Sequence, residues 1–297
     1  MSEAVPITVA IPTYRREAVL IETLQYLLAL SYTAKEIIVL DQTAQHEPAT
    51  VNALQTMADC GQIRWIQLAE PSIPKAMNKG LLLATQSKVL FVDDDIRPEP
   101  ELLIAHLAAH RIHGDVIVAG RVIQPWHEGL DFSAGDAIHL AGLGQGWINE
   151  FIGCNFSVNR LSALALGGFD ENFIRVAYRY EAEFAHRFCA SGRRIWFEPT
   201  ACLHHLKDAS GGTRTYGEHL TTWRPDHAVG AYYFALRTRA WRELLTRPFR
   251  SVMTRFHLRR PWRIVGTLWA EVRGLLWALR LRASGPRYVT PTESSQL

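Results

Sequence analysis

The sequence predicts an α/β protein built on an open, mostly parallel, doubly wound sheet flanked by helices, with a C-terminal amphipathic helical tail. Three observations predict this fold. Short apolar runs alternate with segments of helical periodicity through the first half of the chain. Polar residues follow the ends of several runs, where open sheets bind their ligands. The 297 residues are 48% hydrophobic and 21% charged, which provides for a large core and excludes a disordered chain.

The predicted elements alternate between strand and helix. The runs that indicate buried strands cover residues 7–11, 36–40, 62–68 and 88–92. The first helix places Leu20, Leu24 and Leu27 on one face. Further helices are predicted at about 49–60, 75–86 and 99–112, with a strand at 116–122 and a loop from about 124 to 150.

Three consecutive carboxylates, Asp93, Asp94 and Asp95, follow the fourth predicted strand. Because like charges this close repel one another, their joint ionisation requires a compensating cation. Mg²⁺ or Mn²⁺, shared with substrate phosphates, is the simplest candidate. The alternative is a solvated acidic turn that caps the helix near Pro98. The chain has no GxxxxGK(S/T) segment and no GxGxxG segment after the first strand, which argues against P-loop nucleotide hydrolysis and dinucleotide cofactors.

Two ordered sets of motifs run along the chain. The first is Ile-Pro-Thr-Tyr-Arg-Arg at 11–16, Asp41, Pro-Lys-Ala-Met-Asn-Lys-Gly at 74–80 and Phe-Val-Asp-Asp-Asp at 91–95. The second is Asn-Phe-Ser at 155–157, Gly-Gly-Phe-Asp-Glu at 167–171, Tyr-Glu-Ala-Glu at 180–183 with Arg187, and Pro-Thr-Ala at 199–201 leading to His204 and His205. Their order and spacing over residues 6–215 resemble the family 2 inverting glycosyltransferases of the GT-A type.

The resemblance implies a catalytic domain over residues 1–225, with a nucleotide-sugar-binding half at 1–123 and an acceptor-side half at 124–225. It implies transfer of a sugar from a nucleotide-diphosphate sugar to a hydroxyl of a glycan, polysaccharide or lipid-linked saccharide, by a metal-dependent inverting displacement. Two alternatives stay open. One is a catalytically inactive relative that binds sugar nucleotide or acts as a membrane scaffold. The other is a nucleotidyltransferase, although the Gly-rich first loop of that class is missing.

The resemblance also implies a donor site. Asp41 would accept a hydrogen bond from the nucleobase, which favours a UDP-sugar, and the Thr13-Tyr14 loop would pack on the base. Asp93 would bind the ribose. The ion, Mn²⁺ or Mg²⁺, would be held by Asp95, Asp93 and His205, or by the neighbouring His204 in place of His205. The other candidates for nucleotide binding are Pro12, Arg16, Lys75, Asn78 and Asp94.

Glu181 is the predicted catalytic base. Counting back from Arg187 places Tyr180 and Glu181 where relatives usually carry Glu-Asp, so the chain departs from the family pattern at both positions. A glutamate can still take a proton from an acceptor hydroxyl as that oxygen attacks the anomeric carbon. We expect Glu183, two residues further on, to point elsewhere and to lie at the surface.

The acceptor side offers aromatic and polar candidates. Trp126 and Trp147 flank the predicted loop, where their rings could stack on a sugar. The full set of acceptor-binding candidates is Trp126, Trp147, Asn155, Asp170 and Arg214. Arg214 and Lys75 are also candidates for stabilising charge on the leaving diphosphate. His106, His110 and His113 recur at helical spacing and are predicted to form the polar edge of a helix rather than a metal site.

The C-terminal region, residues 226–297, is strongly basic. Residues 229–287 contain thirteen Arg, no Lys and two acids, a formal charge of +11, whereas the whole chain carries +3. From Ile264 onward apolar residues repeat at helical spacing for about 18 residues, short of a membrane span. The pattern favours a helix lying on an anionic membrane surface over a nucleic-acid partner. The alternative is a helix docked on the catalytic domain.

The expected location is the cytoplasm, with peripheral attachment to the cytoplasmic face of the inner membrane. The first residues show no basic and apolar signal pattern, and the four cysteines form no CxxC pair.

Overall fold

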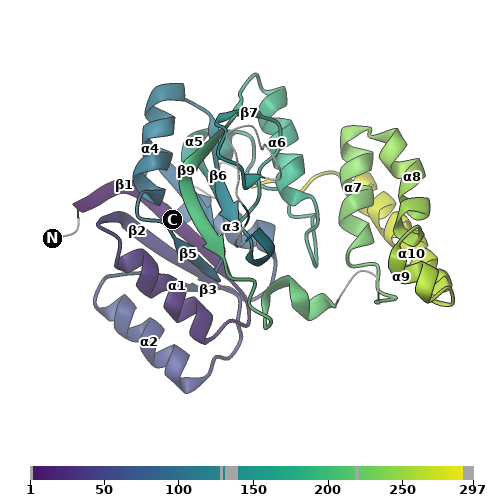
Figure 1. Ribbon diagram of the computed structural model, residues 1–297, viewed down its shortest axis with the longest axis horizontal. Coiled ribbons are helices and arrows are strands. Elements are labelled where there is room, and N and C mark those ends of the chain that lie inside the picture. The colour runs from purple at the N-terminus through teal and green to yellow at the C-terminus, as the bar shows by residue number, and fades with distance from the viewer. Residues whose placement is uncertain (1–2, 128–129, 131–139, 218–220, 290–297) are drawn as a thin grey trace.

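The computed structural model of the protein describes residues 3–127, 130, 140–217 and 221–289. A twisted sheet lies at the centre with helices on both faces, and four helices, α7 to α10, form a separate lobe beside it (Figure 1). The α/β fold predicted from the alternation of elements is confirmed.

The elements follow the predicted order closely. The strands are β1 (Glu3–Thr13), β2 (Tyr32–Asp41), β3 (Arg64–Gln67), β4 (Lys88–Val92), β5 (Ile96–Pro98), β6 (Ile117–Ile123), β7 (Gly146–Ile148), β8 (Asn155–Asn159) and β9 (Ile195–His205). The helices of the sheet body are α1 (Ala18–Leu28), α2 (Pro48–Asp59), α3 (Ile73–Leu83), α4 (Leu102–His113), α5 (Arg160–Ala165) and α6 (Tyr180–Ala190). Those of the lobe are α7 (Ala228–Thr238), α8 (Trp241–Val252), α9 (Arg255–Arg259) and α10 (Arg263–Ala283). Short 3₁₀ helices η1 (Pro125–His127) and η3 (Gly212–Tyr216) lie in the loops.

The strand order is β3-β2-β1-β4-β8-β6-β9-β5, with β7 paired to β9. The pairings give β1, β2, β3, β4, β6 and β9 one direction, while β5, β7 and β8 run against them. The sheet of the described residues is therefore mostly parallel, as predicted. The carboxyl ends of β1, β4 and β9 meet at one edge, and this is where the site forms.

Alternation along the strands divides the core into two layers. In β4, Val89 and Phe91 face α3, α5, α6 and α7, whereas Leu90 and Val92 face α1, α2 and α4. Side chains alternate between faces along a strand, so a continuous apolar run such as this one fills both layers of a doubly wound fold.

Two of the three histidines of α4, His106 and His110, lie inside the protein, which corrects the prediction that they form a polar helix edge. The third, His113, is partly exposed and stacks on Trp196. His106 and His110 are buried between α4 and β8. His106 bonds to the Asn155 side chain (2.9 Å) and His110 to the Ser157 hydroxyl (2.8 Å). Burial lowers the pKa of His106 to about 4 and that of His110 to about 3, so both rings are neutral at pH 7.

The C-terminal lobe is tied to the sheet body at both of its ends. Val229, Tyr232 and Tyr233 of α7 belong to the core layer that contains α6. After α10 the chain returns to the body, where Val289 donates its N–H to the Gly167 carbonyl (2.9 Å) and Glu171 donates to the Arg287 carbonyl (2.9 Å). Within the described residues, every helix is too short or too polar to cross a bilayer.

Candidate active site

A pocket of about 220 Å³ opens at the carboxyl edge of the sheet. Its walls come from the segments after β1, β2, β4 and β9 and from the start of α6. The lining residues are Pro12, Thr13, Tyr14, Arg16, Gln42, Pro71, Ser72, Ile73, Met77, Asp93, Asp94, Asp95, Arg175, Tyr180, His205, Lys207, Gly212, Thr213 and Tyr216. Six of the predicted donor-site residues and the predicted metal ligands are thus brought together.

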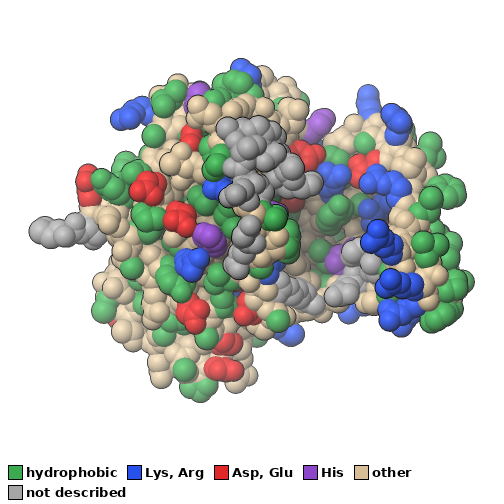
Figure 2. Space-filling view, viewed as in Figure 1, with side chains coloured by type: hydrophobic (Ala, Val, Ile, Leu, Met, Phe, Trp, Pro, Cys, Tyr) green, Lys and Arg blue, Asp and Glu red, His purple; other side chains and the backbone are tan. Residues whose placement is uncertain are grey.

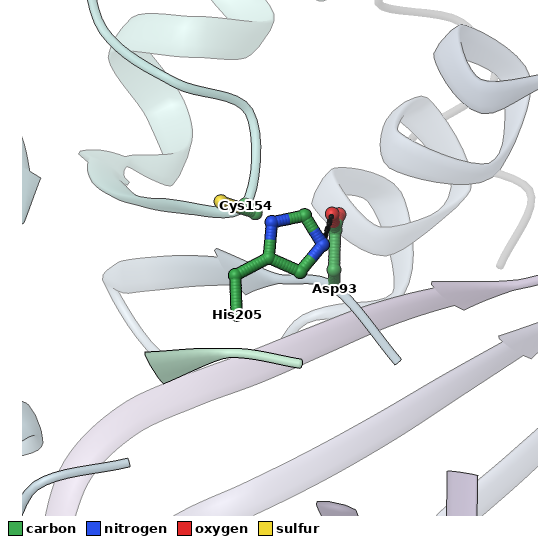
Figure 3. A group of neighbouring side chains, drawn as sticks. All are labelled: Asp93, Cys154 and His205. Carbon is green, nitrogen blue, oxygen red and sulfur yellow. Dashed lines mark ion pairs between the residues drawn. The ribbon is translucent and has the colours of Figure 1, made fainter. Parts of the chain in front are cut away.

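Two carboxylates and an imidazole converge in this pocket. His205 Nε2 lies 3.0 Å from Asp95 Oδ1 and 3.5 Å from Asp93 Oδ2 (Figure 3). Asp95 Oδ1 is buried, and no donor among the described residues completes a well-aligned hydrogen bond to it. Oxygen and imidazole ligands suit Mn²⁺, so this donor set fits the ion that the sequence predicted. His204 instead bonds to Glu99 (2.8 Å), which leaves His205 as the histidine of the cluster.

Cys154 lies on the opposite side of the His205 ring from Asp93 (Figure 3). One ligand atom from each of Asp93, Cys154 and His205 falls within 4.8 Å of the others. Burial raises the pKa of the Cys154 thiol well above its usual value, so the sulfur is protonated at pH 7. Cys154 therefore lies beside the Asp93–His205 pair as a neutral side chain in the absence of an ion.

Arg16 provides an internal cation for the aspartate triplet. Its buried guanidinium pairs with Asp94 Oδ1 (3.2 Å), Asp95 Oδ2 (3.2 Å) and Asp208 Oδ1 (3.0 Å). It also donates to the carbonyls of Asp208 and Ser210. Arg16 thus provides the predicted compensating charge for Asp94 and for Asp95 Oδ2. Asp95 Oδ1 and Asp93 Oδ2 face His205 instead.

The three aspartates have different acidities for identifiable reasons. Burial raises the pKa of Asp94 to about 7, although Arg16 opposes that shift. Burial also raises the pKa of Asp93, and the charge of Asp95 adds to the effect. Burial alone would raise the pKa of Asp95 as well, but His205 and Arg16 together bring it below its usual range. Asp95 is therefore the most acidic of the three.

The loop that follows β9 is clamped onto the loop that follows β1. The Gly212 N–H donates to the Tyr14 carbonyl (2.8 Å), and the Asp208 N–H donates to Asp95 Oδ2 (2.9 Å). Gly211 has a φ of +61°, and a Cβ at this position would collide with the Arg15 carbonyl oxygen. The close approach of the two loops fixes one wall of the pocket.

Asp41 lies behind the pocket wall, fully buried. Its carboxylate accepts bonds from the Thr43 N–H (2.9 Å) and the Trp65 indole (2.9 Å), and His46 Nε2 lies 2.8 Å away. The neighbouring Gln42 lines the pocket instead. The predicted contact between Asp41 and a nucleobase remains a prediction.

Two predicted nucleotide-binding residues face away from the pocket. Lys75 pairs with Glu70 at the surface (2.8 Å). Asn78 is buried and bonds to the backbone of Phe169 through both its amide nitrogen and its amide oxygen. Asn78 therefore joins α3 to the loop at 167–171, which corrects the expectation that it contacts a nucleotide in this conformation.

The N-terminus of α6 places its side chains on different sides. Tyr180 reaches the pocket, and the predicted base Glu181 is partly buried beside it. Withdrawal from water raises the pKa of Glu181 to about 7, the charges of Glu150 and Asp93 add to the shift, and Arg179 opposes it. A carboxyl group with this pKa is suited to general base catalysis near neutral pH.

Glu183 is buried, which corrects the expectation of a surface position. Its carboxylate accepts two bonds from the Arg187 Nε (2.9 Å each) and one from the Tyr288 hydroxyl (3.3 Å), and Arg237 lies 3.4 Å away. The first turn of α6 thus carries both the candidate base, Glu181, next to the pocket residue Tyr180, and Glu183, which anchors the returning C-terminal segment.

The predicted acceptor residues separate into distinct groups. Asn155 and Asp170 are fully enclosed and bonded within the protein, so the structure corrects the prediction that they touch an acceptor. Trp147 pairs with Trp196 in the first half of β9, at the far end of that strand from His205, and is likewise not at the site. Trp126 is exposed and lies 5.7 Å from the Lys207 ammonium at the pocket rim, where an acceptor role stays a prediction. The side chain of Arg214 lies outside the described part of the chain.

Several pocket residues were not predicted from the sequence. They are Arg175, Lys207 and Tyr216, which line the pocket, and Cys154 and Asp208, which lie beside its aspartates. Cys154 directly precedes a quoted motif, and Lys207 and Asp208 directly follow the histidine pair, so their position beside recognised motifs was the available signal. Arg175 and Tyr216 carried no such signal.

The model of the family described as Glycosyl transferase family 2 matches residues 8–161, more than half of the chain. Solved structures of similar fold include the mannosyltransferase PcManGT from Pyrobaculum calidifontis in complex with GDP-Man and Mn²⁺, at 18% identity over 94% of this chain and 79% of that chain, with a TM-score of 0.55. S. aureus TarS 1-349 in complex with UDP-GlcNAc matches at 16% identity over 94% and 83%, with a TM-score of 0.62. No curated protein sequence matches the chain. At these identities the structural likeness establishes the fold.

Proposed function

The chain belongs to glycosyl transferase family 2 and has the GT-A fold, and on this premise we propose that it transfers a sugar from a nucleotide-diphosphate sugar to an acceptor hydroxyl by a metal-dependent inverting displacement. One observation carries the proposal. Asp93 Oδ2, Asp95 Oδ1 and His205 Nε2 converge in a pocket that Thr13 and Tyr14 also line. A group of ion-binding side chains in the same pocket as the Thr13-Tyr14 loop supports binding of a nucleoside diphosphate.

Asp93, Asp95 and His205 would hold the ion, Mn²⁺ or Mg²⁺. When bound, such an ion stabilises the negative charge that develops on the departing diphosphate. The protein's own cation, Arg16, keeps Asp94 and Asp95 in place beside it. Tyr14 and Gln42 offer an aromatic ring and an amide where the base of the donor would lie.

Glu181 is the proposed general base. It would accept the proton of the acceptor hydroxyl while that oxygen forms a bond to the anomeric carbon and the bond to the diphosphate breaks. A single displacement of this kind inverts the anomeric configuration, because the acceptor attacks from the face opposite the leaving group. The raised pKa of Glu181, about 7, supports the assignment.

The donor is proposed to be a UDP-sugar and the acceptor a glycan, polysaccharide or lipid-linked saccharide. The S. aureus structure named above contains UDP-GlcNAc, and the archaeal one contains GDP-Man, so the fold accommodates more than one base. For Asp41 to accept a hydrogen bond from an imide-bearing base such as uracil, its carboxylate must give up a present hydrogen bond, such as that to His46 or to the Trp65 indole.

Thermal-shift measurements with UDP-, GDP- and dTDP-sugars test the proposal. We expect one donor to raise the melting temperature in the presence of Mn²⁺ or Mg²⁺ and to lose that effect in EDTA. Asp95→Ala should abolish the metal-dependent shift, because it removes the most acidic ligand of the cluster. Asp59→Ala, at an exposed site on α2, is the matched control and should behave like the parent. Donor stabilisation that survives both EDTA and Asp95→Ala would contradict the metal site.

A further inference from the structure

The large exposed apolar side chains of the protein concentrate on the C-terminal lobe. We define its apolar face by Trp241, Leu245 and Phe249 of α8 and Val265, Trp269 and Leu276 of α10, all more than half exposed. On α8 these residues are spaced four apart, which places them on one side of the helix. Figure 2 shows hydrophobic side chains gathered along the outer edge of this lobe, on the side away from the sheet body.

The outward direction of the apolar face is fixed by packing. The opposite side of α10 carries the small residues Gly266, Ala270, Gly274 and Ala278, which are buried. A Cβ at Gly274 would lie 2.6 Å from the Ala228 Cβ of α7, and one at Gly266 would lie 2.6 Å from the Trp223 indole nitrogen. Because only small residues fit against α7, α10 cannot rotate its large apolar side chains into the interior.

The charges around the apolar face have one sign. Between residues 241 and 283, eight arginines are exposed: Arg242, Arg250, Arg255, Arg259, Arg260, Arg273, Arg280 and Arg282. The two acids of this segment turn inward. Glu243 lies 3.4 Å from Arg179, and the buried Glu271 lies 3.0 Å from Arg247. The surface that the lobe presents to its surroundings is therefore apolar and cationic, with no acid exposed between residues 241 and 283.

We propose that this face docks the protein on the surface of a bilayer containing anionic lipids. Aromatic and aliphatic side chains bordered by arginines are typical of helices that lie in the membrane interface. The arginines would contact lipid phosphates, while the apolar face enters the boundary of the acyl region. The depth is limited to the interface, because the described helices do not cross a bilayer.

A second copy of the chain and a nucleic acid are both less complementary to this face than an anionic bilayer. A twofold dimer through it would place each set of exposed arginines against an identical set, with no acid to pair them. A nucleic acid would satisfy the arginines but would leave Trp241, Leu245 and Phe249 in water. An anionic bilayer is complementary to both components at once.

Flotation on density gradients tests the proposal with the full chain. We expect the protein to float with vesicles containing phosphatidylglycerol and to remain in the bottom fraction with pure phosphatidylcholine. The triple variant Leu245→Glu, Phe249→Glu, Trp269→Glu should lose at least about tenfold of the floated fraction, because it places charges in the apolar region. The matched control is Ile112→Glu with Leu161→Glu, two side chains on the sheet body that are 71% and 69% exposed. It should float like the parent.

Several outcomes would overturn membrane docking. The proposed docking surface is wrong if the parent protein does not float. It is also wrong if the triple variant floats like the parent. If light scattering shows a dimer and the triple variant is a monomer, the face binds a second copy of the chain. If labelled RNA binds tightly and prevents flotation, the face binds nucleic acid. Circular dichroism confirms that each variant is folded. Flotation needs no sugar donor, so its result is independent of the proposed transferase activity.

Discussion

At the residue scale, the pocket shows how neighbouring carboxylates acquire separate tasks from their partners. Asp94 is held by Arg16 at 3.2 Å, whereas Asp93 and Asp95 direct oxygens toward His205. Arg16 also reaches Asp208, and so couples the triplet to the loop after β9. Because one guanidinium contacts three carboxylates, its loss would remove the cation that is paired with the buried Asp94 and Asp95.

Replacing Glu181 by Gln should separate binding from turnover. The amide keeps the size of the side chain but cannot accept the acceptor proton, so kcat should fall by at least about a hundredfold, while donor affinity measured by calorimetry stays within about twofold. Glu22→Gln, on α1, provides a control expected to retain parental kcat. Near-parental turnover by Glu181→Gln would remove this residue from the reaction.

The pH profile of the parent enzyme should show the same group. Glu181 acts as a base only when it is ionised, and its pKa is raised to about 7. We therefore expect kcat/KM to rise about tenfold per pH unit below pH 7 and to level off above it. The residual activity of Glu181→Gln should lack this inflection. A profile that is flat between pH 5 and 8 would be inconsistent with a base of raised pKa, as ordinary glutamates titrate near about 4.3.

At the element scale, β8 is held in the sheet by side chains as well as by its backbone. Asn155 donates to the carbonyls of Arg121 on β6 and Ala201 on β9, each at 2.9 Å, and accepts from His106 on α4 at 2.9 Å. The hydroxyl of Ser157, the next side chain on the same face of β8, bonds to both His106 and His110 of α4. This polar seam lies inside an otherwise apolar core, where unpaired groups are costly.

Asn155→Ala should reduce stability and leave acceptor recognition unchanged. The substitution removes one partner from each of three buried groups, so the free energy of unfolding should fall by about 3 kcal/mol. Urea denaturation measures this loss, and the KM for acceptor should stay within about twofold in the folded variant. Asn52→Ala, at an exposed position on α2, should be neutral. A raised acceptor KM with parental stability would instead restore Asn155 as a binding residue.

The sequence predicted elements and the site edge better than side-chain direction. The apolar runs located β1, β2 and β4, because alternation and length are local properties. The triplet was placed at the site because parallel strands end at the same edge, and His205 was added to it by the resemblance to the family. In contrast, Asn78 and Asn155 look like ligand-binding residues in the sequence but are bonded inside the protein. Their partners come from distant segments, so no local pattern reveals them.

At the scale of the whole molecule, the C-terminal lobe completes the body of the protein. Tyr232 and Tyr233 fill a core layer with α6, and the Tyr233 hydroxyl donates to Asp170 (2.8 Å). The strand-like return at 287–289 bonds to the loop that contains Asp170. The division at residue 225 thus stays a prediction about folding units, and it does not separate two independent contact networks.

Among the groups that titrate in mild acid, the buried His106 and His110 of α4 should lower the stability of the fold as the pH falls. Asp94 and Glu181, whose pKa values are raised to about 7, should oppose that fall in the same pH range. The folded-state pKa values of His106 and His110, about 4 and about 3, lie below the ordinary value of 6.5, so the unfolded chain binds more protons between these limits. The histidine contribution to stability is fully present above about pH 6.5 and is lost as the pH falls toward 4 for His106 and toward 3 for His110. The loss is on the order of 3 kcal/mol per histidine.

Urea midpoints measured from about pH 8 to about pH 5 check this expectation. Relative to the parent, His110→Gln should shift the slope toward greater stability in acid, because it removes one group that binds a proton more readily in the unfolded state. His186→Gln, at an exposed position on α6, should keep the slope of the parent. Equal slopes in all three proteins would show that the acid sensitivity has another origin.

The hydrogen bond from Val289 to Gly167 also has a consequence for biosynthesis. During translation, the loop at 167–171 emerges long before its partner at 287–289, with more than a hundred residues made in between. The sheet can assemble on the ribosome once β9 has emerged. The hydrogen bonds from the Arg287 N–H to Asp170 and from the Tyr288 hydroxyl to Glu183 can form only later. Until residues 287–289 have been synthesised, Asp170 lacks the Arg287 N–H and Glu183 lacks the Tyr288 hydroxyl, so this seam closes after the strands of the sheet have been made.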